Sequence, residues 1–159
     1  MKKVYLSIGG NLGNRTANLA KAIFLIEQRI GQVLALSSLY KTKAWGVENQ
    51  PDFLNQALIV ATVLSPEKVL EYALHIETLM GRKREQKWYT RLIDIDLLFF
   101  EQEIIKTPDL TLPHPFLEKR NFVLVPLAQI APDFIHPILQ KSVADLLKEC
   151  ADTLEVDRI

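Results

Sequence analysis

Two aspartates separated by one residue, Asp94 and Asp96, are the clearest chemical feature of the sequence. They lie inside residues 92–100, a run that is otherwise wholly apolar and therefore a poor place for carboxylates without a function. In a strand the side chains alternate between two faces, so both carboxylates would share one face while Ile95 and its apolar neighbours enter a core. Neighbouring carboxylates repel each other unless a cation compensates, and Mg²⁺ takes carboxylates together with substrate phosphates. The pattern favours a magnesium site.

A basic segment precedes the aspartates. Between residues 82 and 91 there are five cations and one anion, Glu85, so the local charge is 5 − 1 = +4, whereas the whole chain is neutral. The cations are Arg82, Lys83, Arg84, Lys87 and Arg91. Arginines bind the non-bridging oxygens of a polyphosphate, so the segment and the aspartates together predict a metal–polyphosphate site. A salt-bridged surface on an edge strand is the alternative for an Asp-X-Asp pair.

Other residues suit a flat ligand and a phosphate. Phe53 and Asn55 would share one face of a strand, where a ring can stack on a heterocycle and an amide can donate and accept hydrogen bonds. Taken alone, Phe53 is better explained as a core residue than as a ligand platform, and the neighbouring amide shifts this only modestly. His114 stands between two prolines that hold the backbone extended, and a histidine presented in this way can donate to a phosphate. Glu77 falls in the last turn of a predicted helix, where the dipole disfavours an anion. A nearby cation or a metal-bound water would hold it there, but a solvated side chain is the simpler interpretation.

The elements that must position these residues follow from hydrophobic spacing. The pattern predicts strands at residues 4–8, 33–39, 53–63, 92–100 and 122–127, helices at residues 14–30, 65–81 and 142–149, and a hairpin formed by residues 104–105 and 110–112. The order strand, helix, strand, strand, helix, strand predicts an α+β, ferredoxin-like antiparallel sheet. We expect helices on one face of this sheet, a small extra hairpin and a C-terminal helix.

Composition limits the classes of function. The 159 residues fit one domain, which we expect to span residues 1–159. Equal numbers of basic and acidic residues, 19 each, argue against a nucleic-acid coat or a membrane-surface protein. The single cysteine, Cys150, excludes an intrachain disulfide, and we find no signal-peptide pattern or membrane-spanning run. We expect a cytoplasmic monomer that binds neither nucleic acid nor membrane.

Short motifs occur along the chain in a defined order. They are Ser7-Ile8-Gly9-Gly10-Asn11-Leu12-Gly13, Tyr40-Lys41-Thr42, residues 50–55, Gly81-Arg82-Lys83-Arg84, Trp88, residues 91–98, Pro113-His114-Pro115 and residues 120–124. As a set they resemble the 6-hydroxymethyl-7,8-dihydropterin pyrophosphokinases of folate biosynthesis, and the Arg-X-X-Asp-X-Asp element followed by Pro-His-Pro is highly specific. The resemblance covers nearly the whole chain.

The resemblance implies an activity and a set of site residues. Members transfer the β,γ-pyrophosphoryl group of ATP to the pterin hydroxymethyl oxygen and release AMP. By resemblance, Asp94 and Asp96 would bind two Mg²⁺ ions, and Arg82 and Arg91 would join them in catalysis. ATP would be bound by Glu77, Arg84, Trp88, Leu97, Thr111, His114 and Arg120, with Leu97 and Thr111 meeting adenine mainly through backbone groups. The pterin would be bound by Thr42, Trp45, Phe53, Asn55 and Phe122, with Phe53 and Phe122 on either side of its ring.

The sequence departs from the family pattern at three places. The usual Trp-Gly-Pro-Arg or Trp-Ala-Pro-Arg is Trp88-Tyr89-Thr90-Arg91 here, which makes the approach to Arg91 less rigid. Phe116 stands where many members have arginine, and Trp45 stands where a smaller residue is more common. None of these changes removes a metal ligand.

Two other functions fit parts of the pattern. A glycosyltransferase could use Asp-X-Asp to hold a metal and a nucleotide sugar, but it leaves Pro-His-Pro and the Phe53/Asn55 pair unexplained. A ferredoxin-like RNA-binding module could use the basic segment and the aromatic residues. The neutral charge and the absence of an aromatic-rich ribonucleoprotein motif count against that module.

Overall fold

The computed structural model describes residues 1–43, 51–81 and 92–159. In chain order its elements are β1 (Lys2–Gly10), α1 (Arg15–Arg29), β2 (Gln32–Leu36), β3 (Tyr40–Thr42), β4 (Phe53–Thr62), α2 (Pro66–Leu79), β5 (Asp94–Phe100), β6 (Ile105–Lys106), β7 (Thr111–Leu112), a 3-10 turn (Leu117–Lys119), α3 (Asn121–Ile130), α4 (Val143–Glu149) and β8 (Val156–Arg158). Within these ranges no helix has both the length and the apolar character needed to cross a membrane.

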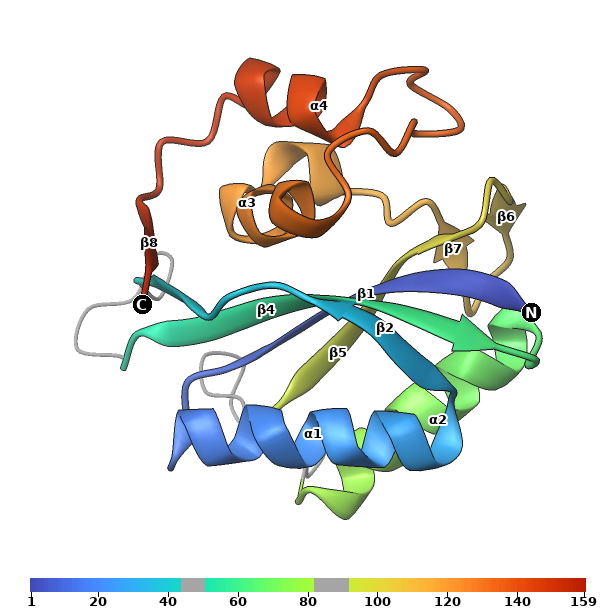
Figure 1. Cartoon of the computed structure of the whole chain (residues 1–159), viewed down its shortest axis with the longest axis vertical. Coiled ribbons are helices and arrows are strands. Elements are labelled where there is room, and N and C mark those ends of the chain that lie inside the picture. Colours follow the sequence, from blue (N-terminus) through green and yellow to red (C-terminus); the bar gives the residue numbers. More distant parts are fainter. Residues whose placement is uncertain (44–50, 82–91) are drawn as a thin grey trace.

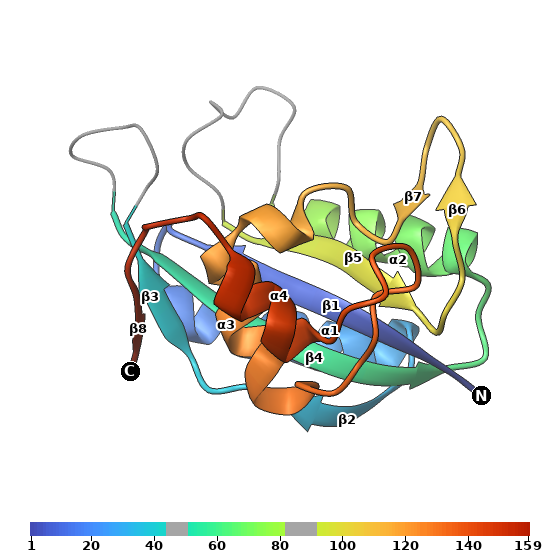
Figure 2. The same cartoon turned by 90° about the horizontal axis from the view of Figure 1, so that it is seen from above.

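The main sheet is antiparallel, with the strand order β5-β1-β4-β3-β8 and with β2 also paired to β4. The neighbours β5, β1, β4 and β2 have the ferredoxin-like arrangement, and the crossovers between them are α1 and α2 (Figures 1 and 2). The α+β prediction is therefore confirmed. The sequence did not predict β8, a short polar strand that pairs with β3. The small hairpin of β6 and β7 was predicted and is present.

The strand predicted over residues 33–39 ends early, at Leu36, and the separate strand β3 begins beyond the predicted range. The Oγ of Ser37 accepts the N–H of Ala57 at 2.8 Å, while its own N–H donates to the carbonyl of Ala57 at 2.9 Å. The Nε2 of Gln56 also donates to the carbonyl of Ser37 at 2.8 Å. Because a side chain replaces part of the backbone ladder here, β2 ends at Leu36 and β3 resumes at Tyr40.

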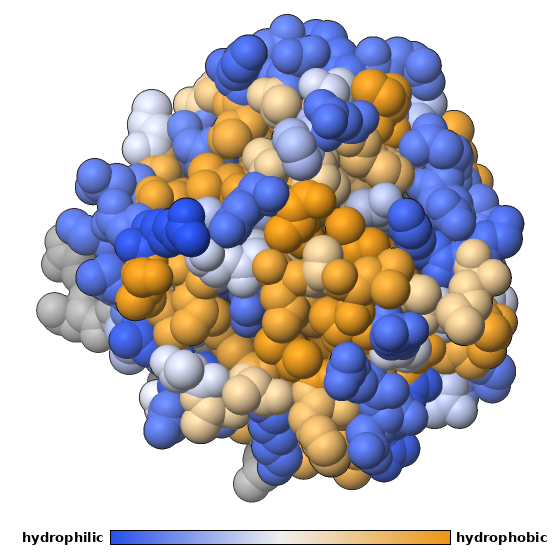
Figure 3. Space-filling view, in the orientation of Figure 1, coloured by the Kyte–Doolittle hydropathy of each residue, from blue (hydrophilic) through white to orange (hydrophobic). Residues whose placement is uncertain are grey.

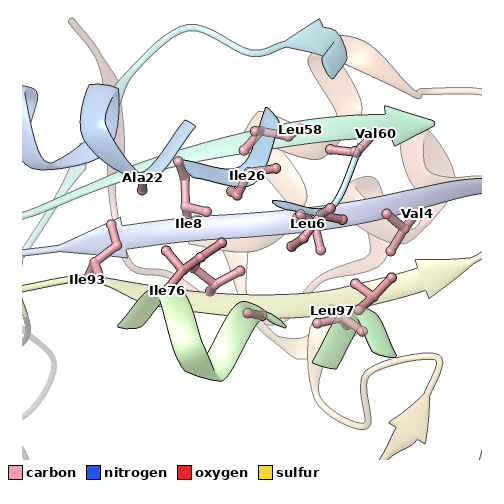
Figure 4. Packing of buried hydrophobic residues seen from close by; sticks show 14 of the residues in the cluster. Val4, Leu6, Ile8, Ala22, Ile26, Leu58, Val60, Ile76, Ile93 and Leu97 are labelled. Carbon is pink, nitrogen blue, oxygen red and sulfur yellow. The ribbon is translucent and has the colours of Figure 1, made fainter. Parts of the chain in front are cut away.

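Helices α1 and α2 cover one face of the sheet and bury an aliphatic core against it. Figure 4 shows side chains of β1, β4 and β5, such as Ile8 and Leu58, packed with Ile26 and Ile76 of the helices. Both helices begin where the sequence predicts, because Asn14 accepts the N–H of Ala17 and Ser65 accepts the N–H of Lys68.

Helices α3 and α4 cover the other face, so the expectation of helices on one face alone is wrong (Figure 1). Beneath them lies a second core that includes Tyr5, Phe99 and Leu124. Its rings are in close contact, since the centroids of Phe99 and Phe134 are 4.4 Å apart.

The strand predicted over residues 122–127 is also wrong, because these residues form most of α3. Val123, Leu124 and Leu127 are buried, which is the i, i+1, i+4 spacing of a helical face. A short apolar run does not distinguish a strand from a buried helix by periodicity. Pro126 was the available signal, because a proline cannot donate to the ladder of a central strand.

An apolar surface lies at the opposite side of the sheet from β5. Figure 3 shows apolar side chains gathered over the middle of the face that β2 crosses in Figure 1. On β2 itself, Leu34 is 48% exposed and Leu36 is 44% exposed. Since β2 pairs with β4 and β5 pairs with β1, the width of the sheet separates this surface from the aspartates.

The buried histidine His136 is expected to make the stability of the fold depend on pH. Its Nδ1 accepts the N–H groups of Ile138 and Leu139, both at 3.1 Å, and its ring lies edge-on to Phe99. Burial lowers the pKa of His136 below its ordinary value, while the carboxylate of Glu118 acts in the opposite direction. As the pH falls through about 6.5, the unfolded chain takes up the proton first, so the folded state loses stability relative to it.

We therefore expect the free energy of unfolding in urea to be smaller at pH 5.5 than at pH 7.5. An asparagine can accept backbone N–H groups without titrating, so His136→Asn should reduce this difference. The control is His75→Asn, which replaces an exposed histidine of α2 and should keep the wild-type difference. An unchanged pH dependence in His136→Asn would mean that other groups cause it.

Candidate active site

The two aspartates lie at the start of β5, on the face covered elsewhere by α3. In the register with β1, Asp94 is opposite Gly9 and Asp96 is opposite Ser7. Ile95, between them, is buried in the core beneath α1 and α2. Both aspartates are partly exposed, and small residues stand opposite them, so this part of the face is open to a ligand. The predicted alternation along the strand is confirmed.

Glu77 lies under the same strand. Its side chain is 3% exposed, and its Oε2 accepts the N–H of Ile95 at 2.7 Å. The expectation that Glu77 is solvated is therefore wrong. This hydrogen bond holds the backbone between Asp94 and Asp96 from beneath.

His114 is attached to β5 just beyond the aspartates, because its N–H donates to the carbonyl of Leu98 at 3.0 Å. Its Nδ1 accepts the N–H of Phe116 at 3.3 Å, so in the neutral ring the proton is on Nε2, which can donate to an anion. Burial and then the charge of Arg120 lower the pKa of His114, and Glu118 opposes them. The lowered pKa favours the neutral ring, in which Nε2–H is the donor. Donation from His114 to a phosphate stays a prediction.

Arg120 and Phe122 stand at the beginning of α3. The Cζ of Arg120 lies 5.4 Å from the ring centroid of Phe116 and 5.7 Å from that of Phe122, so the guanidinium is held near two aromatic faces. Phe116, which departs from the family pattern, thus contributes to placing Arg120. The side chain of Phe122 is partly buried against the core under α3.

Asn55 and Thr42 form a buried polar pair on the sheet beside the aspartates. Asn55 is 6% exposed, Thr42 is 3% exposed, and the Nδ2 of Asn55 donates to the Oγ1 of Thr42 at 3.0 Å. A methyl group added to Gly9 would lie 2.4 Å from the Oδ1 of Asn55, so the amide rests directly over this glycine. The hydrogen bond to Thr42 and the close approach to Gly9 fix the orientation of the Asn55 amide. An amide held in one orientation can recognise the polar edge of a heterocycle.

Phe53 opens β4 on the same face as Asn55 and is partly buried. The chain just before it is anchored to the turn that follows β1. The Nδ2 of Asn11 donates to the carbonyl of Pro51 at 3.1 Å, and Arg15 donates to the carbonyl of Asp52 at 2.6 Å. These bonds set the approach to Phe53.

Several predicted site residues lie outside the described residues or contribute little by side chain. Arg82, Arg84, Trp88, Arg91 and Trp45 lie outside the ranges that the structure describes. The side chain of Leu97 is buried, and Thr111 is exposed on β7. In the described ranges no group of three or more histidine, cysteine, aspartate or glutamate side chains gathers as a metal cluster. Two carboxylates suit Mg²⁺, which completes its shell with water and phosphate oxygens.

Comparison with known proteins identifies the family. The family model described as 7,8-dihydro-6-hydroxymethylpterin-pyrophosphokinase matches residues 5–132. The chain belongs to this family. It is 43% identical over 149 residues to the 2-amino-4-hydroxy-6-hydroxymethyldihydropteridine pyrophosphokinase of Aquifex aeolicus, covering 94% of this chain and 92% of that protein. The protein of the same name from Bacillus subtilis is 42% identical over 127 residues, which are 79% of this chain and 76% of that protein.

Solved structures show the same fold at low sequence identity. A crystal structure of wild-type Plasmodium falciparum HPPK-DHPS superposes with a TM-score of 0.75 and 18% identity, covering 94% of this chain. An HPPK-DHPS in complex with substrates gives a TM-score of 0.74 and 16% identity over 92% of this chain. This chain spans 43% of each of those chains. Membership of this family favours a pyrophosphokinase, which is a transferase, over the glycosyltransferase and the RNA-binding module.

Gly9 lies among the candidate site residues, and the sequence did not single it out as one of them. Gly13, with a φ of 68°, occupies a left-handed position in the turn after β1. Gly9 instead lies inside β1, beneath Asn55. The available signal was a glycine at the end of an alternating strand pattern, which often marks a close approach.

Proposed function

We propose that this chain transfers the β,γ-pyrophosphoryl group of ATP to the hydroxymethyl oxygen of 6-hydroxymethyl-7,8-dihydropterin, with release of AMP and dependence on Mg²⁺. One observation carries the proposal. Asp94, Gly9 and Asn55 stand in one row across neighbouring strands, on one face of the sheet. The amide of Asn55 covers Gly9, so a heterocycle bound to this amide would lie next to the carboxylates of β5, with its substituent on the phosphate side of the site.

We assign the pterin to the residues around Asn55, which lies opposite Gly9 on the neighbouring strand. Its amide can donate to and accept from the polar edge of the ring, and its contact with Thr42 keeps the amide in one orientation. Phe53 on β4 and Phe122 on α3 come from elements that pack against each other, and we assign them to the two faces of the ring. Trp45 would complete this side.

We assign the triphosphate of ATP to the hydrogen-bond donors and cations around β5. His114 offers Nε2–H, and Arg120 offers a guanidinium held by aromatic rings. We assign Arg82, Arg84 and Arg91 to the triphosphate by family resemblance, with Trp88 at ATP and Leu97 and Thr111 at adenine. We assign Glu77 to the positioning of β5, because its carboxylate accepts the N–H of Ile95 between the two aspartates.

Asp94 and Asp96 would hold the metal, for which we propose two Mg²⁺ ions. When bound, Mg²⁺ neutralises the charge of the triphosphate and acidifies the attacking hydroxyl. In the proposed reaction the pterin oxygen forms a bond to the β-phosphorus. The bond from that phosphorus to the oxygen it shares with the α-phosphorus breaks, AMP leaves with that oxygen, and the hydroxyl proton passes to Asp96 or water.

The test is to identify the product of ATP. The purified chain is incubated with ATP, Mg²⁺ and the hydroxymethyl pterin, and nucleotides are separated by ion-exchange chromatography. We expect one AMP for each pterin consumed, and no AMP when the pterin is omitted or EDTA is added. Formation of ADP would overturn the reaction type, and AMP formed without Mg²⁺ would overturn the metal requirement.

A further inference from the structure

Helix α3 begins without a capping residue of its own. Of the four α-helices in the described ranges, α1, α2 and α4 are capped by the side chains of Asn14, Ser65 and Ser142, whereas the N-cap of α3, Arg120, makes no side-chain capping bond. A guanidinium has no acceptor, so it cannot bind the N–H groups of a first turn. The position is occupied by a residue whose chemistry suits a phosphate rather than a helix start.

Asp152, from the C-terminal segment, supplies the missing cap. Its Oδ2 accepts the N–H of Asn121 at 3.0 Å, and its carbonyl accepts the Nδ2 of Asn121 at 2.7 Å. Its Oδ1 accepts the N–H of Leu154 at 2.9 Å, which keeps the carboxylate in place. A carboxylate at a helix N-terminus is also favoured by the helix dipole.

The same segment links the two sides of the proposed pterin site. Beyond Asp152 it becomes β8, which pairs with β3 so that Val156 is opposite Thr42, the partner of Asn55. Figures 1 and 2 show it descending from α4 to the edge of the sheet beside β3. It therefore connects the start of α3 with the strand that orients Asn55, and it lies beyond residues 5–132, which the family model matches.

We propose that Asp152 is a positioning residue that holds the first turn of α3, and with it Arg120 and Phe122, against the substrate site. The inference rests on the proposed function, because Arg120 is assigned to phosphate and Phe122 to the pterin. The bonds of Asp152 end at Asn121, which stands between those two residues in the chain. Loss of the carboxylate removes the bond to the N–H of Asn121, while the bond from its Nδ2 to the backbone carbonyl of residue 152 remains. The first turn is therefore loosened between Arg120 and Phe122.

The test uses Asp152→Ala, with Asp152→Asn as the conservative variant and Ser142→Ala as the matched control. Ser142 caps α4 and touches no site residue named above, so its loss removes a comparable cap elsewhere. We expect Asp152→Ala to raise the KM for the pterin and for ATP roughly tenfold, with a smaller change in kcat. Losing a helix cap costs about 1.4 kcal/mol, which corresponds to a tenfold change in affinity. We expect Asp152→Asn to restore both values to within about twofold, and Ser142→Ala to leave them unchanged.

A second measurement decides the role of Asp152 without catalysis. Amide hydrogen exchange of residues 121–124 should be faster in Asp152→Ala than in the wild type and in Ser142→Ala. Unchanged exchange there would overturn the proposal, as would wild-type KM values in Asp152→Ala or equal KM increases in Ser142→Ala. Absence of AMP formation by the wild type would overturn the proposed function instead, and the exchange experiment would still show whether Asp152 holds the first turn.

Discussion

Asp94→Ala and Asp96→Ala are each expected to lower kcat roughly a thousandfold or more. Each variant removes a carboxylate from the place where the triphosphate charge must be neutralised, and a loss of about 4 kcal/mol of transition-state stabilisation corresponds to that factor. The two aspartates share one face opposite Gly9 and Ser7, so neither has a neighbouring carboxylate on β1 to replace it. The measurement is AMP formation at saturating ATP and pterin over a series of Mg²⁺ concentrations.

The control for these variants is Asp133→Ala, an exposed aspartate in the turn after α3, which should keep wild-type turnover. Circular dichroism of each variant verifies the fold. Turnover within tenfold of the wild type in either Asp94→Ala or Asp96→Ala would contradict the assignment of both residues to the metal. A defect overcome by raising Mg²⁺ would place the loss in metal binding rather than in the chemical step.

The aspartate strand could be predicted from sequence because its information is local. Side chains of a strand alternate with a period of two, so the spacing of Asp94 and Asp96 alone places them together and places Ile95 in the core. The helix starts at Asn14 and Ser65 are equally local, since the capping residue lies within one turn of the N–H that it accepts. These features need no knowledge of tertiary contacts.

Other features depend on contacts between distant parts of the chain. The sequence cannot show that Glu77 lies under β5, because the bond to Ile95 depends on how α2 packs on the sheet. Asp152 likewise lies 31 residues from Asn121 in the sequence. The short strand β8 forms by pairing with β3, which is far from it in the chain. The apolar run of α3 was wrongly predicted as a strand for a related reason. Packing against the second core decides between strand and helix there, and hydrophobicity alone does not.

Gly9→Ala is expected to raise the KM for the pterin roughly 30- to 150-fold, with a much smaller effect on the KM for ATP. The new Cβ would lie 2.4 Å from the Oδ1 of Asn55, so the amide must turn away from Thr42. Loss of an oriented hydrogen-bonding group from a buried site costs about 2–3 kcal/mol, which gives that factor. Steady-state kinetics with each substrate varied in turn measures the effect.

A double-mutant cycle with Asn55→Ala tests whether the damage passes through the amide. If it does, Asn55→Ala alone should raise the KM for the pterin about as much, and adding Gly9→Ala should change it little further, because the clashing oxygen is gone. The same Cβ would also lie 3.0 Å from the carbonyl of Leu54, which is backbone and remains in the double variant. Effects of the two substitutions that multiply would therefore place the damage in β4 itself, and Gly9 would then matter for the sheet rather than for the orientation of Asn55.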